Sequence, residues 1–139
     1  MKSAEFRENF KAFLDDDNRY RRFLTLINHG KEKRLLFWQE QVLEKFCKAS
    51  LIDVPNFEYI QTIFAICEVH YVPLERGKVK VFRGHVDYSD EYNRVSIESF
   101  PNSHLSEING PAELYGKFID VLFCPSCRDA EKSWEQENA

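Results

Sequence analysis

The chain has 139 residues, a length that fits one domain or a domain with a helical extension. Hydrophobic residues make up 43% of it and twelve residues are Phe, so a buried core can form without help from a metal. The net charge is −4, no apolar run is long enough to cross a bilayer, and the first residues lack the apolar core of a signal peptide, so we expect a cytoplasmic protein that does not bind membranes.

Apolar residues recur at helical spacing in three stretches of residues 1–56. The first stretch is residues 3–14, and the second lies between the polar residues 15–18 and Gly30, which suits the end of a helix. The third stretch is residues 31–49. We therefore expect residues 1–56 to form a helical region of about three helices. The residues expected on its buried faces are Phe6, Phe10, Phe13, Leu14, Tyr20, Phe23, Leu24, Ile27, Leu35, Trp38, Val42 and Phe46.

The remaining region, residues 57–139, begins with an ambiguous segment and continues with two predicted strands. Residues 57–66 mix β-branched and aromatic residues at a spacing that also fits a helix, and we favour a helix or a mixed segment. Residues 77–84 alternate apolar and basic side chains between two glycines, which is typical of a half-buried strand. Residues 117–123 form the second predicted strand.

A long loop is predicted between these two strands, followed after the second strand by a helix. Residues 85–116 are rich in Asp, Ser, Asn, Pro and Gly, which indicates a loop, and one short strand is expected within it at residues 94–97. The helix is predicted at residues 125–136. Pro125 fits its first turn because the missing N–H of proline needs no partner there.

Two short pairs of metal-ligand residues frame the predicted strands, Cys67-Glu-Val-His70 and Cys124-Pro-Ser-Cys127. In each pair two residues separate the ligands, a spacing that lets both side chains reach one cation. Three thiolates and one imidazole are a common ligand set for structural zinc. The sequence therefore predicts one Zn²⁺ bound by Cys67, His70, Cys124 and Cys127. The remaining cysteine, Cys47, lies outside this motif.

Two alternatives to this assignment stay open. His85 or His104 could take the place of His70 as the fourth ligand, although the two-residue spacing favours His70. The second pair, Cys124 and Cys127, could instead be a redox motif or a set of free thiols. A redox Cys-x-x-Cys motif is typical of a βαβ setting, whereas here a single charged helix follows it, so the redox interpretation is disfavoured.

The order of ligand pair, strand, strand, ligand pair and helix resembles the treble-clef class of zinc fingers over about residues 66–136. Cys67 and His70 match the zinc knuckle of that class, and Cys124 and Cys127 match its helix-borne pair. The resemblance implies an α+β fold in which the N-terminal helices pack on a zinc module of knuckle, β-hairpin and helix. The long span between the strands departs from it. Such fingers bind nucleic acids or proteins or form nuclease sites, so no single function is implied.

A catalytic zinc keeps one coordination position open for water or substrate, and four protein ligands would leave none. We therefore expect a structural zinc in a protein that is not an enzyme. A less favoured hypothesis places a metal-dependent active site at His85, near the acidic residues Asp87, Asp90 and Glu91. A treble-clef nuclease would need a further His or Asn on the last helix, where only Asn138 stands, close to its end.

Charge is distributed unevenly, with eight Lys and Arg against three Asp and Glu in residues 19–48, and four against eleven in residues 87–139. The leading hypothesis is a protein-interaction module whose partner is another protein or a second copy of the chain. The alternative is nucleic-acid binding through Lys78, Lys80 and Arg83 together with a basic region of the N-terminal helices. That region contains Arg19, Arg21, Arg22, Lys31, Lys33 and Arg34.

Overall fold

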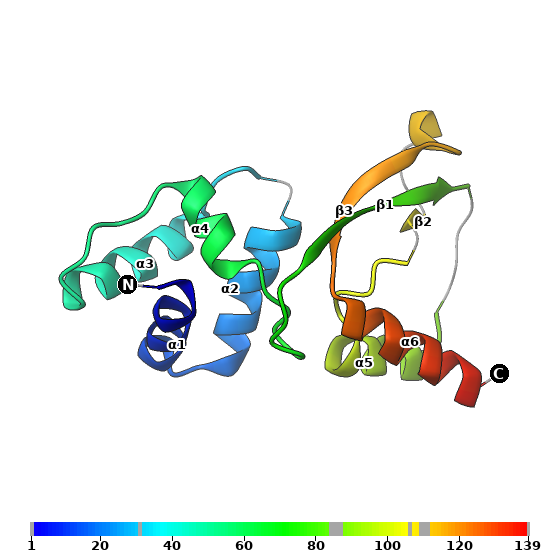
Figure 1. Ribbon diagram of the computed structural model, residues 1–139, viewed down its shortest axis with the longest axis horizontal. Helices are drawn as coiled ribbons and strands as arrows, with labels where there is room; N and C mark the ends of the chain where they lie inside the picture. Colours follow the sequence, from blue (N-terminus) through cyan, green and yellow to red (C-terminus); the bar gives the residue numbers. More distant parts are fainter. Residues whose placement is uncertain (1, 31, 84–87, 106, 109–111, 139) are drawn as a thin grey trace. The chain divides into compact units, whose positions relative to one another are not determined.

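The computed structural model describes residues 2–30, 32–83, 88–105, 107–108 and 112–138. The chain divides into two compact units, Met1–Ile66 and Cys67–Ala139, each described here by itself (Figure 1). The division falls after residue 66, whereas the sequence suggested a boundary after residue 56. Packing of the N-terminal helices on the C-terminal module stays a prediction. No helix in the described part of the chain is long and apolar enough to cross a bilayer.

Unit 1 consists of helices α1 (Ser3–Leu14), α2 (Asp17–His29), α3 (Phe37–Ala49) and α4 (Phe57–Phe64). The three helices expected before residue 57 are confirmed, and so is the helical interpretation of the segment that follows. Side chains of the first two helices bind the carbonyl groups at the end of the fourth. Arg7 donates to the carbonyl of Ile63 at 2.6 Å and Asn28 to that of Phe64 at 2.9 Å, which ties α4 to unit 1.

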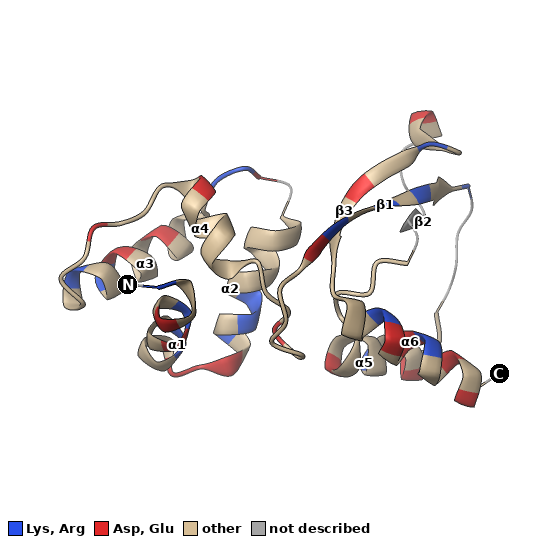
Figure 2. Ribbon diagram, viewed as in Figure 1, with Lys and Arg blue, Asp and Glu red and all other residues tan. Residues whose placement is uncertain are grey.

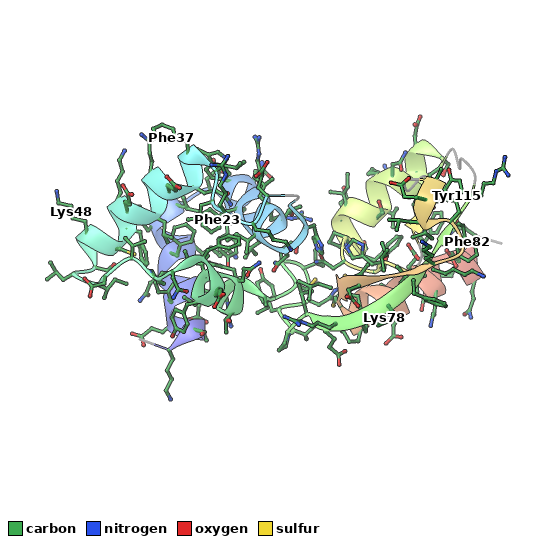
Figure 3. The ribbon with its side chains drawn as sticks, turned by 90° about the horizontal axis from the view of Figure 1, so that it is seen from above. Phe23, Phe37, Lys48, Lys78, Phe82 and Tyr115 are labelled. Atoms are coloured by element: carbon green, nitrogen blue, oxygen red, sulfur yellow. The ribbon has the colours of Figure 1, made fainter. Side chains whose placement is uncertain are left out.

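Phenylalanine rings fill the centre of unit 1. Phe10 and Phe23, whose ring centroids lie 4.7 Å apart, are both fully buried, and Phe46 and Phe64 meet Phe10 edge to face at 5.3 and 5.5 Å. Edge-to-face contact of aromatic rings adds a favourable electrostatic term to the burial of their apolar surface. Figure 3 shows Phe23 among the helices, whereas Phe37 projects from the outer side of α3 and is exposed.

The third helix begins later than the sequence suggested. A helix over residues 31–49 was expected, but α3 starts at Phe37. Gln39 explains the difference, because its side chain accepts a hydrogen bond from the amide of Leu36 at 2.8 Å and donates to the carbonyl of Phe23 at 3.3 Å. The first bond closes the helix start, and the second fixes it against α2.

Unit 2 is built on an antiparallel pair of strands, β1 (Glu75–Phe82) and β3 (Phe118–Phe123), with Glu75 opposite Phe123 and Lys80 opposite Phe118. The two expected strands are thus confirmed and paired. A third, two-residue strand adds in parallel to the other side of β1 and gives the order β2-β1-β3. The remaining elements are β2 (Glu107–Ile108), α5 (Asp90–Ser99), the 3₁₀ turn η1 (Ala112–Leu114) and α6 (Pro125–Glu137).

The short strand expected at residues 94–97 is wrong, because this segment belongs to α5. Ser89 starts the helix by accepting a hydrogen bond from the amide of Tyr92 at 3.1 Å. Tyr92 and Val95, three residues apart, then face the same core cluster of unit 2. A spacing of three places both side chains on one face of a helix, whereas it would place them on opposite faces of a strand.

The core of unit 2 is small and centres on cysteines. Its fully buried members are Cys67, Cys124 and Cys127 with Phe100, and Val79 and Val81 of β1 are buried outside this cluster. A ring of partly buried apolar side chains surrounds them: Val69, Val72, Leu74, Tyr92, Val95, Ala130 and Trp134. The potential metal ligands therefore lie where a larger domain would place its aliphatic core, and what binds there bears directly on the stability of this unit.

Candidate metal centre

The first ligand pair lies on a tight turn just before β1. The amide of Cys67 donates to the carbonyl of Val72 at 2.9 Å, and the amide of Tyr71 donates back to the carbonyl of Cys67 at 3.0 Å. Tyr71 takes up a left-handed conformation, with φ of 56°, which allows the chain to reverse. Within the turn, the amide of His70 points at the sulfur of Cys67, 3.5 Å away.

The second pair opens α6. Cys124 is the N-cap residue, and its sulfur accepts a hydrogen bond from the amide of Cys127 at 3.4 Å. Pro125 occupies the first turn, as expected. Free amide groups at a helix start favour negative charge, so this position stabilises thiolates. The backbone amide of Cys124 in turn donates to the carbonyl of Asn102 at 2.8 Å, which fixes the residue before the helix begins.

The fold brings the two pairs together. The three sulfur atoms and a ring nitrogen of His70 all lie within 4.8 Å of one another. Nδ1 of His70 lies 3.6, 3.7 and 3.3 Å from the sulfurs of Cys67, Cys124 and Cys127. A tetrahedron with Zn–S bonds of about 2.3 Å and Zn–N bonds of about 2.0 Å has edges of about 3.5–3.8 Å. The four side chains thus fit one tetrahedral metal ion.

Disulfide formation does not account for these contacts. All four cysteines of the chain are free, and the sulfurs of Cys67 and Cys127 lie 3.6 Å apart, far beyond a covalent S–S bond. The fourth cysteine, Cys47, is buried in the core of unit 1, where burial raises the pKa of its thiol. It therefore acts as a small apolar core residue, as its position outside the motif suggested.

The electrostatics of the cluster favour a thiolate at Cys67. A hydrogen bond from Cys127 lowers the pKa of Cys67 to about 4, with further help from the amide of His70 and from Asn102 and against the effect of burial. The same hydrogen bond, followed by burial, raises the pKa of Cys127. Because a metal binds thiolates rather than thiols, the contacts that lower the pKa of Cys67 also favour metal binding.

Asn102 supports the cluster from outside. Its side-chain nitrogen lies 3.3 Å from the sulfur of Cys67 and donates to the carboxylate of Glu68 at 2.8 Å. Together with the bond from Cys124 to its carbonyl, these contacts connect Asn102 to both ligand pairs. Sequence reasoning missed this residue, because nothing in a long polar loop distinguishes an Asn that contacts sulfur from one that faces solvent.

Arg128 holds the segment next to Asn102 in place. Its guanidinium donates to the carbonyls of Ser103 at 2.8 Å and His104 at 2.9 Å. The charged group also lies over the ring of Phe123, 3.5 Å from its centre. The first residues of α6 therefore order the loop that carries Asn102 as well as supplying two cysteines.

His104, Asp90 and Glu91 are not part of this cluster. His104 lines a separate cavity, and His70 takes the fourth position of the group. His85 and Asp87 lie outside the described residues, so an active site around them stays a prediction. Asp90 and Glu91 are exposed at the start of α5. Among the residues that the structure describes, the Cys67 cluster is the only group of three or more potential ligands.

Comparison of the chain with protein-family models, curated proteins and solved structures finds no match. The site must therefore be interpreted from its own chemistry. Three sulfurs and one imidazole can hold one metal ion, and four protein ligands complete a tetrahedral coordination shell. Such a shell leaves no position for a water or a substrate, which favours a structural ion over a catalytic one.

Proposed function

We propose that the protein is a protein-interaction module whose second unit is stabilised by one structural Zn²⁺. The observation that carries this proposal is the compact Cys67, His70, Cys124 and Cys127 cluster at the centre of a small core. Soft thiolates combined with an imidazole favour zinc over the oxygen-seeking ions Mg²⁺ and Ca²⁺. No position remains for metal-based catalysis.

The arrangement of unit 2 supports a treble-clef type of zinc finger. A turn with the first ligand pair precedes β1, the antiparallel partner β3 returns the chain, and α6 carries the second pair at its start. The segment between the strands holds a helix that a minimal finger does not need. This insertion and the helices of unit 1 supply surface beyond the zinc site, which suits a binding module.

Metal analysis tests the zinc proposal directly. The purified chain should contain one Zn²⁺ per molecule, and Cys127→Ser should lose most of it, whereas Cys47→Ser should retain it. Removal of the ion by a chelator should abolish the near-ultraviolet circular dichroism of Trp134, which packs on the core of unit 2, when it is measured in a Trp38→Phe background that removes the tryptophan signal of unit 1. Metal-free protein with an unchanged spectrum would refute a structural role for the ion.

A protein partner is supported by apolar side chains that unit 1 leaves in solvent. Leu51 is 93% exposed and has a left-handed backbone, with φ of 57°, and Phe37 also projects into solvent. The left-handed backbone of Leu51 lowers stability while its side chain buries no surface within the unit, and we infer that this side chain contacts a partner. Sedimentation of Leu51→Asn beside the unchanged chain tests the simplest partner, a second copy.

A second function, binding of single-stranded nucleic acid, is favoured by the open face of β1 and β3. Lys78, Lys80 and Phe82 alternate with buried residues along β1, and Phe118 lies opposite Lys80. Figure 2 shows basic positions in blue along β1. Phe82 and Phe118 are 46% and 64% exposed. Bases stack on exposed aromatic rings while lysines bind phosphates. Figure 3 shows Lys78 and Phe82 on the same strand.

Asp120 makes this second function testable. It pairs with Lys78 at 3.1 Å across the strands and so opposes a phosphate at that position. Binding of a labelled oligouridine should fall steeply with salt, weaken in Phe118→Ala and strengthen in Asp120→Asn. Absence of binding at low salt, or binding that neither variant changes, would exclude this face as a nucleic-acid site.

A further inference from the structure

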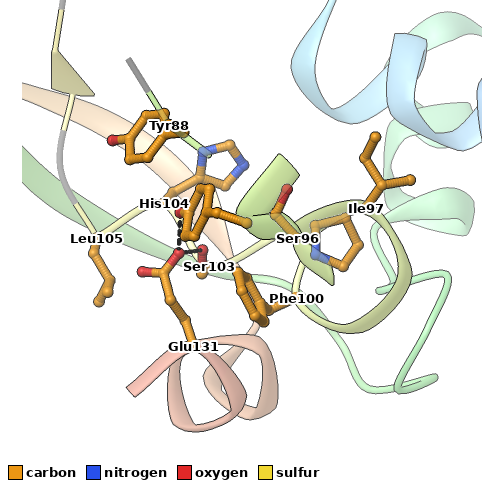
Figure 4. Close-up of a pocket in the computed structure, with 10 residues that line it drawn as sticks. Tyr88, Ser96, Ile97, Phe100, Ser103, His104, Leu105 and Glu131 are labelled. Atoms are coloured by element: carbon orange, nitrogen blue, oxygen red, sulfur yellow. Dashed lines mark hydrogen bonds between the residues drawn. The ribbon is translucent and has the colours of Figure 1, made fainter. Parts of the chain in front are cut away.

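Unit 2 contains a cavity of about 300 Å³ that is separate from the metal cluster, since none of the four ligands lines it. It lies between α5, α6 and the segment around His104 (Figure 4). Tyr88 and Ile97 at its rim are exposed, so the cavity is open to solvent. Such a volume is at the small end of the roughly 300–1,000 Å³ typical of ligand pockets and suits a single side chain.

A buried carboxylate forms the floor of this cavity. Glu131 of α6 is only 5% exposed, and its Oε1 accepts hydrogen bonds from the hydroxyl groups of Tyr92 at 2.6 Å and Ser103 at 3.2 Å. Figure 4 shows both bonds meeting at one oxygen, with the second oxygen turned to the side where Leu105 lies. Among described residues, none donates to Oε2 and none forms an ion pair with Glu131.

Among described residues, Oε2 of this carboxylate has no protein donor, and it is not enclosed but reaches the open cavity. A buried charge is unfavourable unless an opposite charge or several hydrogen bonds compensate it. Tyr92 supplies one bond reliably, because burial and the nearby Glu131 raise the pKa of its hydroxyl well above the usual range, so the group stays protonated. The second oxygen of Glu131 still has room for an external N–H donor with positive charge.

The walls of the cavity favour the same kind of ligand. The rings of Tyr88 and Tyr92 are stacked, with centroids 4.5 Å apart, and the ring of Phe100 lies 5.8 Å from that of Tyr92. Aromatic faces attract cations, and the stem of a long basic side chain packs well on apolar rings. A phosphate or a carboxylate would instead meet the negative charge of Glu131.

We propose that this cavity binds the ammonium or guanidinium group of a Lys or Arg side chain from a protein partner. The N–H groups of that side chain donate to Oε2 of Glu131, and its stem lies along Tyr88 and Tyr92. This binding site deepens the proposed function. It rests on that function in one respect, that the bound side chain belongs to a protein partner. It makes Glu131 a binding residue.

The test uses the full-length, zinc-loaded chain and two small probes, N-acetyl-lysine methylamide and its neutral norleucine counterpart. Saturable shifts of the amide signals of Ser96, His104 and Glu131 in NMR spectra report binding. The lysine probe should bind and the norleucine probe should not, because only the first carries charge. Absence of saturable shifts up to the solubility limit, or equal binding of the two probes, would overturn the proposal.

Variants on the same helix separate the pocket from general charge effects. Glu131→Gln keeps the shape of the side chain. It should lower the affinity for the lysine probe at least about tenfold, in keeping with loss of a charge-assisted hydrogen bond. Glu137→Gln removes the same charge at an exposed position outside the cavity and should leave binding unchanged. Equal effects of the two variants would contradict a role for Glu131.

A third variant covers the case in which Glu131→Gln fails to fold. Tyr88→Ala removes an exposed wall of the cavity. It should lower the affinity for the lysine probe about two- to fivefold, because the cation–π contact is lost. Unchanged binding in Tyr88→Ala would overturn the proposed position of the stem. Free butylamine binding more tightly than the lysine probe would overturn the assignment to a protein side chain.

Failure of the zinc proposal gives a different result. Zinc content and the near-ultraviolet spectrum are measured on the same samples. A chain that binds no zinc but still binds the lysine probe through Glu131 would refute the zinc proposal. The proposed binding site at Glu131 would then still stand. A zinc-containing, folded chain that does not bind the probe would refute the proposed binding site at Glu131 and leave the zinc proposal standing.

Discussion

Leu51 follows α3 in a conformation that usually belongs to glycine. The amides of Leu51 and Ile52 donate to the carbonyls of Lys48 at 3.3 Å and Cys47 at 3.0 Å, the hydrogen bonds of a Schellman motif. We expect Leu51→Gly to raise the free energy of unfolding of unit 1 by about 0.5–1 kcal/mol, because it relieves a left-handed backbone that costs a non-glycine residue about 1 kcal/mol. Urea titration followed by circular dichroism measures the change.

A matched variant at the same position isolates backbone strain from loss of the side chain. Leu51→Ala removes the exposed apolar atoms but retains the left-handed conformation, so it should bring no gain. If alanine stabilised unit 1 as much as glycine, the strain argument would fail. If Leu51 contacts a partner, both variants should weaken that contact although only one changes stability.

Asn102 tests whether the surroundings of the metal cluster determine its affinity. Asn102→Ala removes the N–H group directed at the sulfur of Cys67 and should lower zinc affinity about 10–100-fold, the usual effect of losing an outer-sphere partner. Competition with a chromophoric chelator measures the affinity. Ser103→Ala is the control, because Ser103 is also buried but binds Glu131 rather than sulfur. An equal loss in both variants would indicate general destabilisation.

The contrast between these residues shows what could be predicted at this scale. The four members of the metal cluster were predictable, because two local pairs with the right spacing already define most of a tetrahedral site. Asn102 and Glu131 were not, because their partners lie in segments far along the chain and their residue types are common on surfaces. A polar residue acquires its role only when the fold brings its partner near.

At the scale of elements, prediction succeeded where one face of an element is apolar along its length. The N-terminal helices and the two paired strands have such patterns, and they were found with small errors at their ends. The segment that became α5 has none, since none of its residues is fully buried and only the spacing of Tyr92 and Val95 indicates a helix. The start of α3 was also missed, because it depends on the contact between Gln39 and Phe23.

Gly77 allows β1 to approach the ring of Phe123. A Cβ atom at position 77 would lie 2.8 Å from a ring carbon, and the guanidinium of Arg128 also packs on that ring, 3.5 Å from its centre. We expect Gly77→Ala to lower the stability of unit 2 by about 1–2 kcal/mol, because the ring must shift within packed surroundings. Urea denaturation followed by the fluorescence of Trp134, in a Trp38→Phe background that removes the signal of unit 1, measures the loss.

A double-mutant cycle identifies the cause of that loss. In a Phe123→Leu background the same Gly77→Ala change should cost clearly less, because the ring that clashes is absent. Equal costs in the two backgrounds would show that the alanine acts on the strand itself and not through Phe123.

Tyr92 links α5 to α6 and gives unit 2 a defined pH dependence. The folded-state pKa of its hydroxyl is raised above the unfolded value by burial and by Glu131, so its contribution to stability is fully present below about pH 10 and is lost as the pH rises further. The stability advantage of the unchanged chain over Tyr92→Phe should therefore stay constant up to about pH 9 and shrink from about pH 10 upward. Urea titrations at several pH values measure it.

An exposed tyrosine serves as the reference for that experiment. Tyr115→Phe changes a side chain that lies in solvent, and the difference between this variant and the unchanged chain should stay constant over the same pH range. A constant difference for Tyr92→Phe as well would mean that its hydroxyl does not titrate with folding.

At the scale of the whole molecule, the two units are stabilised by different means. Unit 1 buries a large cluster of aromatic and aliphatic side chains. Among its described residues, unit 2 has one fully buried phenylalanine beside its three cysteines, so an ion bound by the cysteines would replace much of an apolar core. Composition alone could not reveal this division. The chain has twelve phenylalanines, but their number does not show that most of the buried ones belong to unit 1.

Zinc should accordingly stabilise one unit and leave the other unchanged. Thermal unfolding should show two transitions, and raising free zinc to a hundred times its dissociation constant should stabilise unit 2 by about 2.7 kcal/mol, because the ion binds only the folded unit. Far-ultraviolet circular dichroism reports mainly the helices of unit 1, and Trp134 reports unit 2. With Cys67→Ser the zinc-dependent transition should disappear while the unit 1 transition keeps its midpoint. One transition that moved as a whole with zinc would mean that the two cores unfold together, and the apolar core of unit 1 would then depend on the metal as well.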